Sequence, residues 1–249
     1  MLKIVGMTKE ELLGLHPNSL MRPGSTQLLT EEEVIYIAET LGAHWKYNYE
    51  AAKLGKPGLH AELKSLLHSD GFFVSAILLE SPNIRTITAD QLVLRFNQLG
   101  IPKPDWVAGI PKGATKLGED VAQIMGVKNA KMQKETERIE LTTSIGPGES
   151  LLLIEDFCTR GTGFKEAVWD ILSKQPQVKI LPYELVILNR GGLREIVIEG
   201  VGSFQVVAVV EHRVNDWQPD ECPLCQMGSK PIKPKATEEN WRLITTSQQ

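Results

Sequence analysis

Apolar residues recur at helical spacing behind Thr30 and Glu33, a pair of the capping-box type. A Gly-Lys-Pro-Gly turn at 55–58 is expected to end this helix. A shorter helix is predicted for 59–67. The sequence therefore indicates a helical N-terminal extension over residues 1–70.

From residue 71 onward, short apolar runs alternate with segments of helical periodicity. A second capping-box pair, Thr88 and Gln91, is expected to open a helix that runs to Gly100. Further helices are predicted to end at Met125 and to span 164–172. Strands that alternate with helices in this way indicate βαβ units, so we predict an α/β fold with a mainly parallel, twisted sheet flanked by helices over 71–216. The predicted strands are 72–79, 105–110, 127–133, 151–155, 183–188 and 204–210.

After residue 216 the periodicity is lost. Prolines and two of the three cysteines crowd the stretch that begins at Trp217. We therefore expect residues 217–249 to form an irregular C-terminal tail.

Composition narrows the class of protein. The 249 residues include 42% hydrophobic residues, enough for an ordinary core, and the formal net charge of −4 argues against a general nucleic-acid binder. No run of apolar residues is long enough to span a membrane, and the N-terminus does not resemble a signal peptide. Three cysteines do not suggest a secreted disulfide framework, so a cytoplasmic protein is expected.

The most informative segment is 151–163, Leu-Leu-Leu-Ile-Glu-Asp-Phe-Cys-Thr-Arg-Gly-Thr-Gly. A buried strand delivers Glu155 and Asp156 at its carboxyl end, where open α/β sheets bind ligands. The turn that follows offers backbone amides, a helix N-terminus and the hydroxyls of Thr159 and Thr162 to a phosphate. Carboxylates beside such a cradle suit a ribose diol or Mg²⁺. The alternative is an ordinary strand-to-helix turn with a capping threonine.

Four apolar residues, two acids, two further positions and Thr-x-Gly-Thr resemble the 5-phosphoribosyl-1-diphosphate (PRPP) signature of type I phosphoribosyltransferases. The resemblance implies that Glu155 and Asp156 hold the ribose, with Mg²⁺ reaching Asp156 through PRPP. It also implies that the following loop wraps the 5′-phosphate. The loop residues are Thr159, Arg160, Gly161, Thr162 and Gly163.

A second segment, 107–114, is a strand that enters a Lys112-Gly113 turn ahead of a helix. It resembles the diphosphate-binding loop of the orotate phosphoribosyltransferase branch. Glycine lets the backbone approach a diphosphate, and lysine supplies a point charge. The alternative is a solvated helix start.

The segment 131–135 lies where that branch carries an Arg-Lys-Glu-x-Lys strand edge and a mobile catalytic loop. Lys134 and Glu135 match this pattern, whereas Gln133 replaces the arginine and Glu137 the loop lysine. A lid of this kind excludes water and places cations on the leaving diphosphate. The alternative is a solvent-facing pair of charged strands.

The base pocket is less clearly marked. Residues 71–75 resemble the segment that covers the base in orotate enzymes, with Phe73 as the predicted contact, but Asp70 replaces a lysine there. After the signature, Asn189 replaces an aspartate. Arg190 could pair bidentately with a carboxylate such as that of orotate, or lie on the surface in a turn.

Cys222 and Cys225 have the spacing of half a zinc knuckle. Tetrahedral zinc needs four ligands, and the third cysteine, Cys158, belongs to the signature loop. His212 could contribute a ligand, or a symmetric dimer could supply two cysteine pairs to one metal. The alternative is two reduced cysteines in a proline-rich tail.

The resemblance implies a Mg²⁺-dependent pentosyltransferase that uses PRPP and a nitrogenous base, with orotate as a candidate. Lys112, Lys134 and Asp156 are the expected catalytic residues, and a homodimer is the expected assembly. One alternative is a fold relative that senses PRPP or a nucleotide without turnover. The other is an unrelated α/β domain whose turn mimics the signature.

Overall fold

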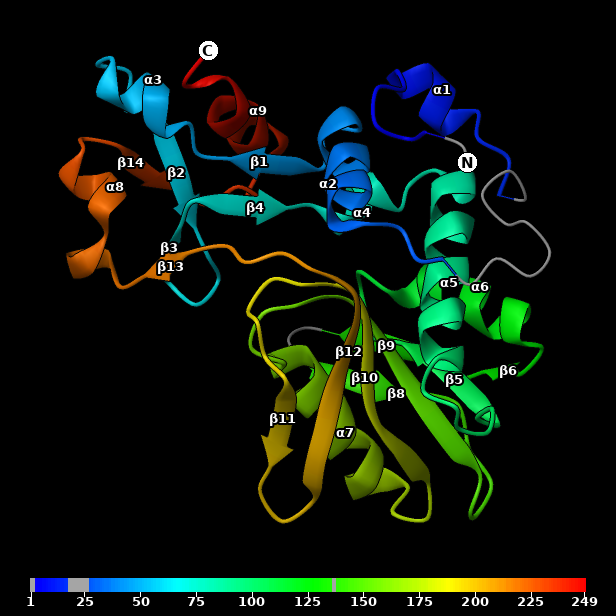
Figure 1. The fold of residues 1–249 in the computed structure, drawn as a ribbon. Helices are drawn as coiled ribbons and strands as arrows, with labels where there is room; N and C mark the ends of the chain where they lie inside the picture. The colour runs from blue at the N-terminus through cyan, green and yellow to red at the C-terminus, as the bar shows by residue number, and fades with distance from the viewer. Residues whose placement is uncertain (1–2, 18–26, 136–137) are drawn as a thin grey trace. The chain divides into compact units, whose positions relative to one another are not determined.

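The computed structural model describes residues 3–17, 27–135 and 138–249, and the chain divides into two compact units (Figure 1). Unit 1 consists of Met1–Ile37 and Leu78–Arg213, and unit 2 of Ala38–Ile77 and Val214–Gln249. These boundaries differ from the three consecutive segments expected from the sequence. The end of the expected extension and the expected tail fold together as unit 2.

Unit 1 contains the central sheet, whose strand order is β11-β12-β10-β9-β5-β6. Neighbouring strands run parallel except for β11, which is antiparallel to β12 at one edge. The predicted α/β fold with a mainly parallel sheet is therefore confirmed. The strands are β5 (Trp106–Gly109), β6 (Lys128–Asn129), β9 (Ser150–Cys158), β10 (Lys179–Asn189), β11 (Glu195–Ile198) and β12 (Gly202–Glu211).

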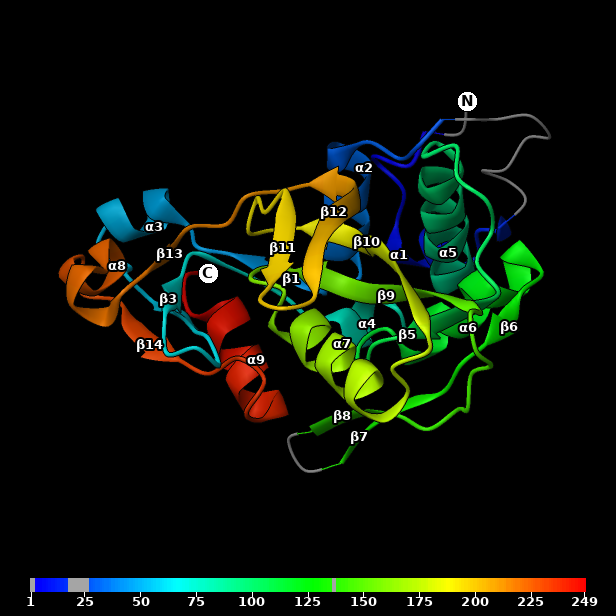
Figure 2. The same ribbon diagram turned by 90° about the horizontal axis from the view of Figure 1, so that it is seen from below.

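Helices cover both faces of this sheet (Figure 2). Side chains alternate along a strand, so Leu151 and Leu153 of β9 pack on the face that carries α7 (Thr162–Lys174). On the opposite face, α5 (Pro82–Asn97) packs against β10 and β12, and α6 (Thr115–Met125) against β5 and β9. Burial on both faces explains why β9 is almost wholly apolar before its acidic end.

Several predicted boundaries in unit 1 need correction. The helix assigned to the Thr88–Gln91 pair begins earlier, with Pro82 in its first turn, and the Thr88 hydroxyl donates within the helix to the Ile84 carbonyl at 2.8 Å. The predicted strand 127–133 divides into β6 and β7. Strand β9 continues to Cys158, three residues beyond its predicted end. The antiparallel hairpin of β7 (Met132–Glu135) and β8 (Arg138–Leu141) lies outside the central sheet.

The other capping box is confirmed. The amide of Thr30 donates to the Glu33 carboxylate at 2.8 Å, and the amide of Glu33 donates to the Thr30 hydroxyl at 3.2 Å. This pair opens α2 (Glu31–Thr40), which follows the short α1 (Lys9–Leu13) along the chain.

Unit 2 has a small sheet with the order β13-β3-β2-β14 and a separate antiparallel pair, β1 with β4. The predicted helix 59–67 is wrong, because its first four residues form β2 and the others form the turn to β3. The predicted strand 72–79 is largely wrong, because β4 ends at Phe73 and α4 follows. The strands are β1 (His44–Lys46), β2 (Leu59–Glu62), β3 (His68–Ser69), β4 (Gly71–Phe73), β13 (Asp216–Trp217) and β14 (Lys230–Ile232).

The C-terminal segment is ordered as part of unit 2, so the expected irregular tail is wrong. Its helix α9 packs against β2, and its apolar side chains share a core with the first segment of the unit. In the part of the chain that the structure describes, no helix combines the length and apolar character that a membrane crossing requires. The helices of unit 2 are α3 (Tyr49–Lys53), α4 (Ser75–Leu78, at its edge), α8 (Pro223–Gln226) and α9 (Glu238–Thr246).

Candidate active site

The signature segment forms the end of β9, a short loop and the start of α7. Gly161 immediately precedes the helix with φ of 64°, a left-handed conformation that favours glycine. A Cβ atom at this position would also run into the side chain of Ile196. Because Gly161 has no side chain that could cap α7, the first amide groups of the helix face the loop as donors for an anion.

The two predicted phosphate motifs meet at Asp156. Gly113, in the loop between β5 and α6, lies so close to the Asp156 carboxylate that a Cβ atom at this glycine would overlap its oxygens. Asp156 also accepts a hydrogen bond from the amide of Phe157 at 2.8 Å. Lys112 is exposed beside Gly113, and the peptide bond that precedes it is cis. The carboxylate and the loop therefore border one place at the edge of the sheet.

Glu155 points the other way, because adjacent residues of a strand face opposite sides of the sheet. Part of Glu155 reaches solvent, and its carboxyl group lies against Gly163, where a Cβ atom would be 2.5 Å from one of its oxygens. Burial and the adjacent Glu184 carboxyl raise the pKa of Glu155 well above its usual value. The fold thus separates the two acids of the motif into one beside the diphosphate-type loop and one beneath the start of α7.

Glu184, which the sequence analysis did not single out, is fully buried on β10. Burial raises its pKa, and it lies beside Glu155 and Cys158 on the α7 side of the sheet. Burial, and then the two nearby carboxyl groups, also raise the pKa of the Cys158 thiol, so this cysteine is a neutral core residue. A single carboxylate inside the apolar run 183–188 was the available sequence signal for Glu184.

The hairpin supplies a lysine near α7. Lys134 of β7 lies with its Nζ 3.8 Å from an Oε atom of Glu166 in the first turns of α7. Gln133 is exposed and pairs across the hairpin with Glu140. Glu137, which is predicted to stand in place of the loop lysine, lies outside the described residues.

The loop is held against the end of β10 through backbone contacts. The amide of Arg190 donates to the Cys158 carbonyl at 2.9 Å, and Gly191 packs directly on the Thr159 carbonyl, where a Cβ atom would not fit. Arg190 is 7% exposed, so the alternative of a surface arginine is wrong. Arg160 is exposed in the loop.

The remaining predicted residues belong to unit 2. Phe73 is buried, and its ring stacks on His44 with the centroids 4.0 Å apart. Asp70, where the resemblance predicts a lysine, accepts hydrogen bonds from the Asn215 amide (3.0 Å), the Asn215 side chain (2.8 Å) and the Tyr49 hydroxyl (2.8 Å). Asp70 therefore joins the two segments of its unit.

Cys222 and Cys225 also lie in unit 2, where the structure places them beside His60 and His68. His212, the candidate third ligand from the sequence, belongs to unit 1 and contacts Glu31 at 2.8 Å. Neither His60 nor His68 was predicted, because their distance along the chain from the cysteines hides the grouping.

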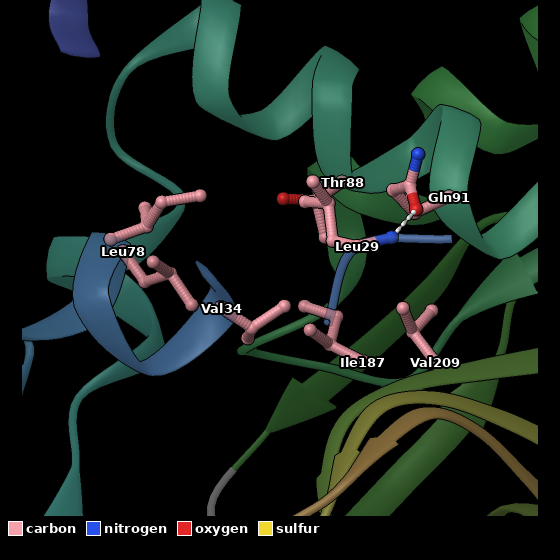
Figure 3. A pocket seen from close by; sticks show the side chains of 8 residues that line it. Leu29, Val34, Leu78, Thr88, Gln91, Ile187 and Val209 are labelled. Atoms are coloured by element: carbon pink, nitrogen blue, oxygen red, sulfur yellow. Dashed lines mark hydrogen bonds between the residues drawn. The ribbon is translucent and has the colours of Figure 1, made fainter. Parts of the chain in front are cut away.

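An apolar cavity in unit 1 is not part of this site (Figure 3). Its volume of about 20 Å³ admits no more than a water molecule. The Gln91 side chain beside it accepts a hydrogen bond from the Leu29 amide at 2.6 Å, as the dashed line marks. The cavity is a packing gap of the α5 face. It is lined by Leu29, Val34, Ile37, Leu78, Thr88, Gln91, Ile187 and Val209.

Known proteins resemble this chain over the larger part of its length. No protein-family model matches it. Orotate phosphoribosyltransferase from Desulforamulus reducens is 28% identical over 181 residues, covering 70% of this chain and 87% of the relative. The same enzyme from Pelotomaculum thermopropionicum is 29% identical over 177 residues, with coverage of 70% and 87%.

Among solved structures, orotate phosphoribosyltransferase from Aeropyrum pernix superposes with a TM-score of 0.52 and 16% identity. The match covers 72% of this chain and 93% of that one, and at this identity it shows the fold alone. The chain is therefore similar in sequence to orotate phosphoribosyltransferases, and it has the fold of the type I phosphoribosyltransferases.

Proposed function

We propose that this protein is a Mg²⁺-dependent phosphoribosyltransferase that transfers the ribose 5-phosphate group of PRPP to orotate and releases diphosphate. The observation that carries the proposal is the contact between Gly113 and Asp156. It brings a lysine-glycine loop and the acidic end of β9 together beside the N-terminus of α7. Orotate is proposed as the base because the relatives are named for it.

Each part of PRPP has a proposed binding group. The loop from Thr159 to Gly163, with the first amides of α7, binds the 5′-phosphate, since backbone donors and a helix N-terminus favour an anion. Asp156 and Glu155 are the proposed ribose-binding acids, of which Asp156 lies against Gly113 and Glu155 against Gly163 at the start of α7. Lys112 and Gly113 receive the diphosphate, because the glycine leaves its backbone open and the lysine adds charge.

The residues fit a Mg²⁺ ion carried by PRPP. Asp156 offers a hard carboxylate at the end of β9, and the absence of a side chain at Gly113 lets that carboxylate lie against the backbone of the lysine-glycine loop. When bound, the ion would neutralise charge on the diphosphate. Asp156 is the protein group proposed to hold it.

In the proposed reaction, a ring nitrogen of the base loses its proton to solvent and forms a bond to C1 of the ribose, while the bond from C1 to the diphosphate oxygen breaks and its electron pair leaves with the diphosphate. Positive charge develops on the ribose and negative charge on the leaving group. The protein's work is positioning and charge stabilisation. Lys134, beside the start of α7, is the proposed cation for the diphosphate as it leaves.

The acceptor side is proposed from fewer contacts. A buried guanidinium such as that of Arg190 suits bidentate pairing with a ligand carboxylate. Phe73, the other base contact predicted from the sequence, lies in unit 2 and is buried against His44. PRPP and the base are the proposed ligands, and a cytoplasmic homodimer is the proposed state.

A second candidate is a PRPP or nucleotide sensor without turnover. It is favoured by Gln133, which is exposed on β7 opposite Glu140 where the orotate branch has an arginine. Such a hairpin would bring fewer cations to the leaving group while the phosphate loop stayed intact.

The test measures diphosphate release with Mg²⁺, PRPP and a panel of pyrimidine and purine bases. Release that depends on orotate is the expected result. Stabilisation of the protein by PRPP without release with any base would overturn the transferase and support the sensor.

Asp156→Asn tests the site itself. It should weaken PRPP binding at least about 100-fold, near 3 kcal/mol, measured by calorimetry. Asp220→Asn, at an exposed position of unit 2, is the control. PRPP affinity unchanged in Asp156→Asn would refute the assignment.

A further inference from the structure

We propose that His60, His68, Cys222 and Cys225 form a structural zinc site in unit 2. One potential ligand atom from each of the four residues lies within 4.8 Å of all the others. All three cysteines of the chain are free. The proposal is independent of the activity proposed for unit 1.

The distances match a tetrahedron around zinc. His60 Nε2 lies 3.0 Å from His68 Nδ1, and Cys225 Sγ lies 3.6 Å and 3.3 Å from these two nitrogens. Cys222 Sγ lies 3.8 Å from His60 Nε2. Bonds of about 2.0 Å to nitrogen and 2.3 Å to sulfur give tetrahedral edges of roughly 3.3 Å between nitrogens and 3.6 Å between nitrogen and sulfur. The four atoms therefore surround a space of the right size.

Local structure aims the histidines at one point. His68 of β3 pairs with Glu62 of β2 in the antiparallel hairpin, and His60 is two residues before Glu62. Because side chains alternate along a strand, both histidines lie on the same face of the sheet. This face receives the cysteines from α8.

The cysteines come from a compact turn. Cys222 precedes α8, whose first residue is Pro223, and Cys225 lies within the helix. The amide of Gly228 donates to the Cys225 carbonyl at 2.9 Å, and Gly228 has a φ of 87° that glycine adopts without strain. The Cys-x-x-Cys spacing and this turn are typical of a zinc knuckle.

Hydrogen bonding beyond the ligands selects the tautomer of His60. Its Nδ1 lies 2.9 Å from the Ser229 hydroxyl oxygen, and that hydroxyl donates to the Gly58 carbonyl at 3.1 Å. The serine oxygen must therefore accept from Nδ1–H, which leaves the Nε2 lone pair free for a metal. Such a second contact is the usual companion of a zinc-bound histidine.

Four protein ligands indicate a structural rather than a catalytic site, because a catalytic zinc keeps an open position. His60, His68 and Cys222 are buried, and Cys225 is partly buried. The histidines belong to 38–77 and the cysteines to 214–249. The ion would cross-link two distant segments of a small unit, for which the apolar core alone is limited.

The primary test uses the full chain, purified without a histidine tag. Elemental analysis should find one zinc per chain. Replacement by Co²⁺ should produce the visible bands of a tetrahedral site and thiolate charge-transfer absorption. Removal of zinc by a chelator should lower Tm and change the fluorescence of the unit 2 tryptophans, Trp45, Trp217 and Trp241.

Variants separate this ligand set from the alternatives. Cys225→Ser should reduce bound zinc to below about a tenth of an equivalent. His212→Gln and Cys158→Ala change the same residue types outside the cluster and should retain it. Because Cys225→Ser could fail to fold, Ser229→Ala provides a milder test, with zinc affinity weakened about 10–100-fold.

The proposal is overturned if the folded wild-type protein holds no zinc and gives no tetrahedral Co²⁺ spectrum when titrated with that ion. A hydrogen-bonded apo cluster or a Cys222–Cys225 disulfide would then account for the grouping. Loss of zinc in His212→Gln with retention in a folded Cys225→Ser would also refute this ligand set. Neither outcome bears on diphosphate release.

Discussion

Two glycines shape the acidic end of β9 by leaving room for carboxylates. Gly113 lies against Asp156 and Gly163 against Glu155. A side chain at either position would compete with the carboxylate for the same space. The small residues of the two motifs are therefore explained by packing within the site as well as by access for a phosphate.

Gly113→Ala tests this packing. The new methyl group would displace the end of the Asp156 side chain, which can rotate away, so PRPP affinity should fall at least about tenfold while Tm changes little. Calorimetry and thermal melts measure the two effects. Gly14→Ala, whose Cβ would come no closer than 3.3 Å to another atom, is the control. Unaltered PRPP affinity in Gly113→Ala would contradict the assigned contact.

Glu184→Gln tests the buried acid pair. Burial raises the pKa of Glu184 in the folded state, so the folded protein binds more protons than the unfolded chain above the ordinary value of 4.5. The free energy of unfolding therefore falls as pH rises from 4.5 toward the folded-state pKa. The variant should be more stable than the wild type at about pH 8, and the gain should shrink on acidification.

Urea unfolding across this pH range measures the effect. Glu199→Gln, at an exposed position, is the control and should not alter the pH dependence. A Glu184→Gln variant that loses stability equally at every pH would contradict the assigned ionisation effect.

Among the helices and strands, the length of β9 has the largest effect on where the two acids of the site lie. It runs to Cys158, so the acid pair lies inside the strand rather than after it. Strand alternation then sends the two acids to opposite faces, one toward the loop before α6 and the other toward α7. The β7–β8 hairpin reaches the same helix through Lys134 and Glu166.

Lys134→Ala tests the hairpin. Removal of a cation beside the leaving diphosphate should reduce kcat by about 10²–10³-fold with little change in Tm. Lys131, directly before β7, forms an exposed ion pair with Glu119. Lys131→Ala is the control and should change kcat less than about fivefold. Steady-state kinetics with PRPP and orotate compare the two, and equal effects would count against a role specific to Lys134.

The whole molecule consists of two units, the second assembled from segments on either side of the first in sequence. Asp70 and Asn215 connect these segments directly. Asp70, where the resemblance predicts a lysine, is thus a structural carboxylate. The core of unit 2 likewise draws on both segments, with Trp45 and Tyr47 from one and Leu224 and Ile244 from the other.

Asp70→Ala tests this connection. Three hydrogen-bond donors would lose their acceptor, so the free energy of unfolding of unit 2 should fall by about 2–4 kcal/mol. Urea melts followed by tryptophan fluorescence report the change, and faster proteolysis of 214–249 should accompany it. Asp220→Ala, an exposed control, should melt like the wild type. Equal melts of Asp70→Ala and the control would contradict the prediction.

The parallel sheet and the helix start at Thr30 were predicted correctly, because apolar runs and a capping box depend on residues that are neighbours in sequence. Thr88 and Gln91 have the same capping-box pattern, but the helix start predicted from them was wrong. That helix begins at Pro82, and the Gln91 side chain accepts a hydrogen bond from the amide of Leu29, which is distant in sequence. Short strands of unit 2 were missed because pairing with remote segments, not periodicity, stabilises them.

By itself, the sequence determined the α/β class, the strand–loop–helix order of the phosphate segment and its likeness to a known family, because each is encoded in consecutive residues. Only the tertiary structure decided that Gly113 borders Asp156, that Glu155 shares its burial with Glu184, and that His60 and His68 meet the cysteine pair. These contacts join residues far apart along the chain, and a separation in sequence carries no information on distance until the chain has folded.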